Sequence, residues 1–78
     1  MNRKIKVLWD FRGPDGLKIA EHHKVHLQEF ADREQLQLLD IGIQKHSDYF
    51  VSAFLTIHES DLLKVRDQLK PQRAVVAD

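Results

Sequence analysis

The chain has 78 residues, with 12 basic and 12 acidic side chains and no cysteine. A domain of this length has a small core, and such domains often self-associate or bind a metal for stability. The missing cysteine excludes disulfides and cysteine-based zinc sites, while the zero net charge argues against nucleic acid or a membrane surface as a partner. We expect a cytoplasmic protein, because no apolar run is long enough for a signal peptide or a membrane span.

The spacing of apolar residues predicts the first two elements. Residues 4–11, KIKVLWDF, alternate between apolar and polar side chains and predict a half-buried strand. The turn RGPDG ends this strand. Apolar residues at helical spacing then predict a helix over 14–33, with the proline tolerated in its first turn.

The second half of the chain repeats this pattern with an added hairpin. Two strands are predicted over 36–45 and 48–57, joined by a short turn. A helix follows over 59–70, and a short strand over 73–76. With right-handed crossovers, this order predicts a single-domain α+β fold, the ferredoxin-like βαββαβ plait, with both helices on one face of an antiparallel sheet. This fold hosts many functions and does not indicate one.

The sheet face opposite the helices is predicted to be open and apolar. Alternation puts Leu8, Leu36 or Leu38, Phe50 and Phe54 on it. An exposed apolar patch usually marks an interface, so we expect a homodimer that buries Leu8, Leu38, Phe50 and Phe54. The alternative is that the C-terminal segment covers the patch, or that it is tolerated. The aromatic residues do not follow the RNA-recognition pattern, which also argues against RNA.

A second candidate site is predicted at one end of the plait. The first loop, the hairpin and the turn before the last strand are expected to bring Arg12, Gly13, His46 and Arg73 together. A helix start with backbone donors and arginines suits a small carboxylate or phosphate, with His46 as a possible acid or base. The alternative is an ordinary strand-to-helix turn with a surface ion pair.

Three of the five histidines lie within EHHKVH, residues 21–26. On a helix His22, His26 and Glu29 share one face, an arrangement that suits weak metal binding. A structural zinc takes four ligands, and no fourth is expected nearby, so we expect no metal and no other cofactor. The alternatives are a solvated helix face or a pH-sensitive contact. His23 is expected to face the sheet and to find one hydrogen-bond partner there.

These patterns favour a self-associating binding module over an enzyme, since no serine or cysteine nucleophile motif is present. The alternative is a small dimeric enzyme whose cleft lies between sheet and helices and uses His23 or His46 with Trp9 and Tyr49. A polar cavity beside Trp9 and His23 would favour the enzyme, and a filled interior would favour the binding module.

Overall fold

The computed structural model describes residues 3–77 and has an α+β fold with a four-stranded antiparallel sheet and two helices, which confirms the predicted class. The elements are β1 Lys4–Arg12, α1 Gly16–Glu34, β2 Asp40–Ser47, β3 Phe50–His58, the 3₁₀ turn η1 Glu59–Asp61, α2 Leu62–Leu69 and β4 Arg73–Val76. Within the described residues, no helix is both long and apolar enough to cross a membrane.

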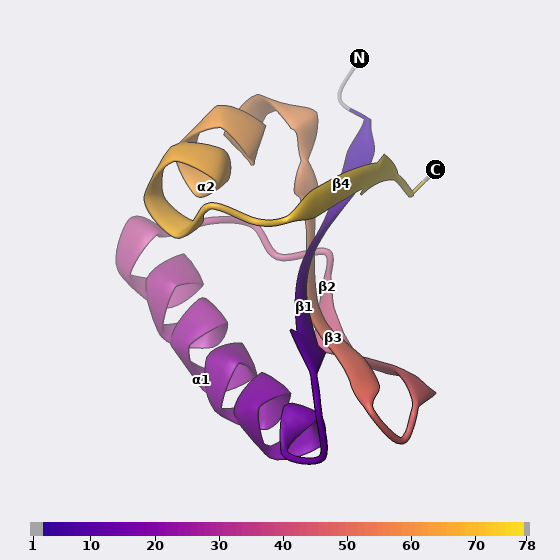
Figure 1. Cartoon of the computed structure of the whole chain (residues 1–78). Helices are drawn as coiled ribbons and strands as arrows, with labels where there is room; N and C mark the ends of the chain where they lie inside the picture. Colours follow the sequence, from indigo (N-terminus) through magenta and orange to yellow (C-terminus); the bar gives the residue numbers. More distant parts are fainter. Residues whose placement is uncertain (1–2, 78) are drawn as a thin grey trace.

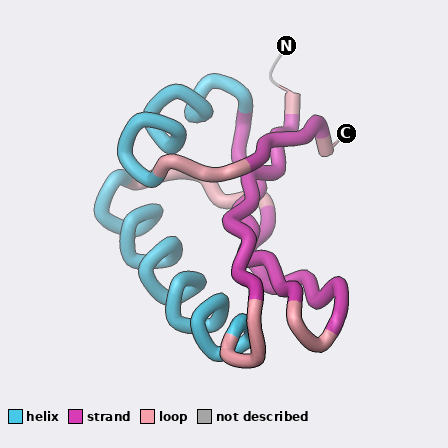
Figure 2. The backbone as a smooth tube through the Cα atoms, viewed as in Figure 1, coloured by secondary structure: helices cyan, strands magenta, loops and turns pink. Residues whose placement is uncertain are grey.

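The sheet has the strand order β2-β3-β1-β4. Figure 1 shows α1 and α2 on the same side of the sheet, so the opposite face is open. The short strand β4 pairs only with the first half of β1, from Ile5 opposite Val76 to Leu8 opposite Arg73. Figure 2 shows β2 and β3 extending as a hairpin beyond the part of the sheet that β4 covers.

The core lies between the sheet and the helices. Alternate side chains of the two central strands point into it, because successive strand residues face opposite sides. They are Ile5, Val7, Trp9, Val51, Ala53, Leu55 and Ile57, and the helices add Ala20, Leu27, Phe30 and Val65. The indole N–H of Trp9 donates to the Leu69 carbonyl at 2.9 Å and ties β1 to the end of α2.

Several element bounds differ from the predicted ones. The second strand begins at Asp40, four residues later than predicted, because Gln35 ends α1 in the left-handed conformation (φ 56°) and an irregular connection follows. The hairpin turn falls at residues 48–49, so the prediction that a strand begins at 48 was wrong. Pro14 and Asp15 form a turn, and α1 starts after them.

The open face is less apolar than predicted. Leu8 is only 3% exposed, because Phe54 of β3 and Arg73 of β4 are its partners in the sheet register on either side. Leu38 packs against the core from the connection before β2, as does Leu36, so neither belongs to the open face. Phe50 does lie on that face with Phe54, and both are half-buried. The predicted patch of four residues is therefore reduced to two aromatic rings.

Candidate functional site

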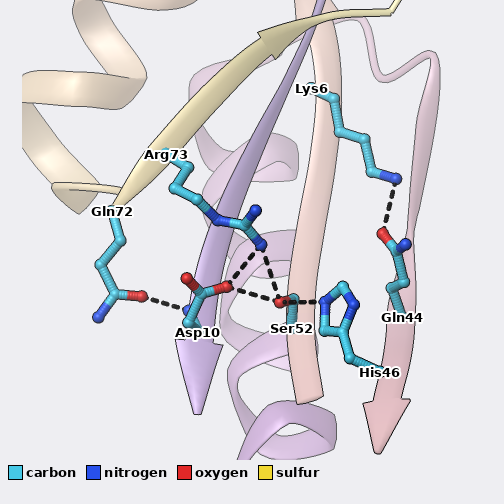
Figure 3. A network of polar contacts seen from close by, with 7 residues as sticks. All are labelled: Lys6, Asp10, Gln44, His46, Ser52, Gln72 and Arg73. Atoms are coloured by element: carbon cyan, nitrogen blue, oxygen red, sulfur yellow. Dashed lines mark hydrogen bonds and ion pairs between the residues drawn. The ribbon is translucent and has the colours of Figure 1, made fainter. Parts of the chain in front are cut away.

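A network of polar side chains crosses the open face (Figure 3). Its centre is Ser52, which is fully buried although it lies on the face without helices. The Ser52 hydroxyl donates to Oδ1 of Asp10 at 2.6 Å, and Nη2 of Arg73 donates to the same oxygen at 2.9 Å. The buried hydroxyl is thus satisfied within the sheet, as buried polar groups usually are.

The network joins side chains from every strand of the sheet. On β2, Nε2 of His46 lies 2.9 Å from Oγ of Ser52. At the other side, the Gln72 side-chain carbonyl accepts from the Asp10 backbone N–H. A separate contact, from Nζ of Lys6 to Oε1 of Gln44 at 3.0 Å, reaches from β1 across β3 to β2. These links fix the relative positions of the strands on their open side.

Asp10 is ionised across the physiological range. Burial alone would raise the pKa of its carboxyl, but the hydrogen bonds from Ser52 and Arg73 and the positive charges of Arg73 and Arg12 outweigh burial. The pKa of Asp10 therefore lies below its ordinary value of 3.8. Asp10 and Arg73 form a charge-assisted hydrogen bond, and their opposite charges cancel.

The hydrogen bonds around Ser52 do not follow the order of a catalytic triad. A serine hydroxyl has one proton, and Ser52 gives it to the ionised carboxylate of Asp10. His46 must then donate through Nε2 to Ser52, so it does not act as the base that activates the hydroxyl. Serine, histidine and aspartate are the residue types of a catalytic triad, but here Ser52 lies between His46 and Asp10. In a triad the histidine lies between the other two. Ser52 is also buried.

Phe54 lies flat across the sheet beside this network. A Cβ atom placed on Gly42 would come within 2.9 Å of Cζ of Phe54, so only glycine at this position leaves room for the ring. Nζ of Lys6 lies 4.3 Å from the ring centroid, within the range of a cation–π contact. Phe54 is thus covered by a lysine on its outer side.

Phe50 is flanked by two basic side chains from neighbouring strands. The guanidinium carbon of Arg12 lies 4.1 Å from the ring centroid, and the His46 ring stacks on Phe50 with centroids 4.4 Å apart. Both aromatic rings of the open face are therefore paired with basic groups. The open face is an aromatic surface covered by basic side chains and not an uninterrupted apolar patch.

The four predicted anion ligands do not form one cluster. The Gly13 N–H donates to the Tyr49 carbonyl at 2.8 Å, so it links the first loop to the hairpin. Arg73 is held by Asp10 on the middle of the sheet. Arg12 and His46 do come together, on Phe50. Two of the four residues thus lie together on the open face, and the other two contact different parts of the chain.

Sequence reasoning did not identify Lys6, Asp10 and Ser52 as parts of one site. Alternation does put all three on the open face, and a serine within an apolar strand is a signal that a polar partner lies nearby. The missing information was the register, which places Asp10 opposite Ser52.

His23 faces the sheet, as predicted, and packs between two aromatic rings. Its centroid lies 5.1 Å from that of Trp9 and 5.4 Å from that of Phe11. The predicted hydrogen-bond partner is not found, because Nε2 is buried without one among the described residues. Burial, with a smaller effect from His26, lowers the pKa of His23 below 6.5 and favours the neutral ring.

His22 and His26 lie on the outer side of α1 and stack on one another, with ring centroids 4.7 Å apart. Nδ1 of His26 lies 3.2 Å from Oε1 of Glu29, so the three residues share one face as predicted. Among residues 3–77, no group of three or more histidine or carboxylate side chains is arranged to hold a metal ion.

The residues of the predicted enzyme site are separated by the sheet. His23 and Trp9 contact one another on the helix side, whereas His46 lies on the open face and Tyr49 is 64% exposed at the hairpin turn. An open depression of about 190 Å³ beside His23 is lined by Phe11, Ile19, His22, His23 and His26. Three histidines and no carboxylate are among these lining residues.

Comparisons with known protein families, with curated proteins and with solved structures gave no match to this chain.

Proposed function

We propose that this protein is a ferredoxin-like plait that works as a binding module, and that its open sheet face binds an anionic ligand. The strand order supports the plait, since from the other edge it reads β4-β1-β3-β2 with the helices on one side. The chemistry of the open face, and not the fold, supports the ligand class.

The observation that carries the proposal is the position of Lys6 and Arg12. Each lies over an aromatic ring of the open face, and neither forms an ion pair with any of residues 3–77. Arg73, by contrast, is neutralised by Asp10. Lys6 and Arg12 therefore place two positive charges on one sheet face of a chain whose net charge is zero, and the charge of Arg12 also acts on the Asp10 carboxylate. Such groups attract carboxylates and phosphates.

The spacing of these charges favours a ligand with more than one anionic group. Phe50 and Phe54, which support the two cations, are four residues apart on β3, or about 13 Å at the usual rise of a strand. A single phosphate reaches one cation, whereas a longer polyanion reaches both and gains from bivalent attachment.

His46 adds a basic ring beside Arg12 on this surface. Its Nε2 is bonded to Ser52, and its ring stacks on Phe50, which fixes its position next to Arg12.

Calorimetric titration tests this proposal, with inorganic phosphate and linear polyphosphate as probes. Polyphosphate is expected to bind more tightly than phosphate. Arg12→Gln is expected to weaken polyphosphate binding about tenfold, the lower end of the range for a charge-assisted hydrogen bond.

Lys18→Gln is the matched control, because it removes one positive charge from the exposed surface of α1. Equal losses for Arg12→Gln and Lys18→Gln would mean that only the net charge matters, and would overturn the proposal. Failure of the wild-type protein to bind either probe at low salt would also overturn it.

Self-association through the same face is the second candidate function. Val75 is 46% exposed and lies opposite Lys6 in the register, so it adds apolar surface beside the half-buried Phe54. Light scattering on the wild type and on Phe54→Asp tests this homodimer; a monomeric wild type rules it out. The cytoplasmic location and the lack of nucleic-acid binding stay predictions.

A further inference from the structure

The imidazole of His23 packs in the contact between α1 and β1. Its ring centroid lies 5.1 Å from that of Trp9 and 5.4 Å from that of Phe11. The ring planes are inclined by 57° and 63°, as is typical of aromatic side chains that meet edge to face. His23 thus takes the place of a hydrophobic ring in this contact, but unlike Trp9 and Phe11 it can take up a proton.

One ring nitrogen of His23 is buried without a hydrogen-bond partner among residues 3–77, namely Nε2. A neutral imidazole has one donor and one acceptor, so with the proton on Nδ1 the buried Nε2 is an unpaired acceptor. In the charged ring both nitrogens are donors. Nε2 would then be a charged donor without an acceptor, and burying an unpaired charge costs more than burying an unpaired neutral group.

The strands that face His23 offer no charge to compensate for its proton. On β1 the facing side chains are the two aromatic rings, because Asp10 points to the open face and binds Ser52 there. The side chains of β3 that point toward the helices are Val51, Ala53, Leu55 and Ile57, none of which titrates. The proton on His23 therefore has no carboxylate partner on the sheet side.

The titratable neighbours of His23 on α1 are His22 and His26. Burial is the main reason that the pKa of His23 lies below 6.5, and the positive charge of His26 lowers this pKa further. Glu29 lies 3.2 Å from His26 and pairs with that ring. The helix therefore opposes a proton on His23 in its packed position.

The depression beside His23 offers the ring a second position. Its volume is about 190 Å³, and Phe11, Ile19, His22 and His26 line it together with His23. Since it is open to water, an imidazole that turns into it can donate both N–H groups to solvent. A change between staggered side-chain rotamers moves a ring in this way without a change in the backbone.

We propose that His23 is a pH-sensitive switch in the contact between α1 and β1: when its ring takes up a proton, it turns out from between Trp9 and Phe11 into the depression. The neutral ring favours the packed position, and the charged ring favours the exposed one, so protonation shifts the population between the two. The inner surfaces of Trp9 and Phe11 then become accessible to water. This inference does not depend on the anion site, which lies on the other face of the sheet.

NMR on the wild-type chain tests the switch. The Cε1 proton of His23 reports protonation by its chemical shift, and NOEs from the His23 ring to Trp9 and Phe11 report its position. These NOEs are expected at about pH 8 and should be lost toward about pH 5, with the midpoint of protonation and below pH 6.5. Trp9 is the only tryptophan of the chain, so its fluorescence emission is expected to shift to longer wavelength in the same range while the far-UV circular dichroism stays native.

Three variants sharpen the test. His23→Leu is expected to abolish the change in emission wavelength, because leucine does not titrate. His26→Gln removes a like charge and is expected to move the midpoint to higher pH. Lys18→Gln is its matched control, since Lys18 is exposed on α1 and does not line the depression, and the midpoint should stay unchanged.

NOEs that persist when the ring is charged would overturn the proposal, because the aromatic rings would then hold the charged imidazole in place. A ring that stays neutral until the whole chain unfolds would overturn it too. So would a wavelength change that remains in His23→Leu, or equal midpoint shifts in His26→Gln and Lys18→Gln. Measurement in chloride, without phosphate, keeps the result separate from the test of the anion site.

Discussion

Ser52 and Asp10 share a hydrogen bond of 2.6 Å between neighbouring strands on the open face of the sheet. The bond joins a fully buried hydroxyl to a carboxylate that also binds Arg73. Since β4 pairs only with the first half of β1, this contact helps to hold the last strand in place. The Asp10 carboxylate also holds Arg73 in an ion pair, whereas Lys6 and Arg12 stand over aromatic rings of the open face.

Asp10→Asn is expected to lower the free energy of unfolding by about 1–3 kcal/mol at neutral pH, because it removes the charge from hydrogen bonds that a buried hydroxyl and a guanidinium donate. Chemical denaturation measures the loss. Asp48→Asn is the matched control, since Asp48 is 85% exposed and forms a surface ion pair with Lys45, and its effect is expected to be much smaller. Equal effects would contradict the role given to Asp10.

The same carboxylate should make the fold sensitive to acid. The pKa of Asp10 is lower in the folded chain than its ordinary value of 3.8, so its stabilising contribution is complete above that pH. The contribution is lost as the pH falls through the folded pKa. In Asp10→Asn, the slope of stability against pH below about 4 is expected to be shallower than in the wild type.

His46 is expected to carry its proton on Nε2 when the ring is neutral, because the single proton of Ser52 goes to Asp10. The ¹⁵N chemical shifts of the imidazole distinguish the two tautomers. A proton on Nδ1 would mean that Ser52 donates to His46, and would reopen the possibility of an activated serine. In Ser52→Ala the preference for Nε2 should weaken, since its acceptor is gone.

Gly42→Ala is expected to displace the Phe54 ring and to cost about 1 kcal/mol of stability, because the added methyl group collides with Cζ. The side-chain protons of Lys6 lie over the ring, so ring-current shifts in their NMR signals report its position. Those shifts should be lost in Gly42→Ala and also in Phe54→Leu, the control that removes the ring without a collision. Unchanged Lys6 signals in Gly42→Ala would show that the ring does not depend on the glycine.

His23→Leu is expected to reduce the loss of stability at mildly acidic pH. The pKa of His23 is below 6.5 in the folded chain, so the unfolded chain binds its proton more readily and stability falls as the pH drops below 6.5. Leucine removes this effect and also the unpaired Nε2 atom. Thermal unfolding at several pH values, with exposed His22→Gln as the control, measures the difference; parallel curves for both variants would contradict it.

Periodicity was sufficient for the class of fold and for the residues that face the core. The alternation of Ile5, Val7 and Trp9 and the helical spacing of Ala20 and Leu27 led to buried positions. Periodicity gave the wrong position for Leu38, because an apolar residue that follows a helix can pack on the core from a connection as well as from a strand. It also failed at Leu8, whose burial depends on its partners in neighbouring strands.

The candidate site was only partly predictable for the same reason. Arg12 and His46 were predicted to lie together from residue type and loop position, and they do meet, on Phe50; their role as ligands stays a prediction. That Arg73 would be taken up by Asp10 follows from the register of two strand pairs, which alternation alone does not determine. Composition did not indicate the site either, because a net charge of zero does not show that Lys6 and Arg12 lie on the same sheet face.

The most direct test of the anion-binding face is an NMR map of the amides that shift when linear polyphosphate is added to the wild-type protein. The largest changes are expected on β1 and β3, at Lys6, Arg12, Phe50 and Phe54, with little change on α1 and α2. Changes confined to the helices, or no changes at low salt, would contradict the assignment of the open sheet face as the binding surface.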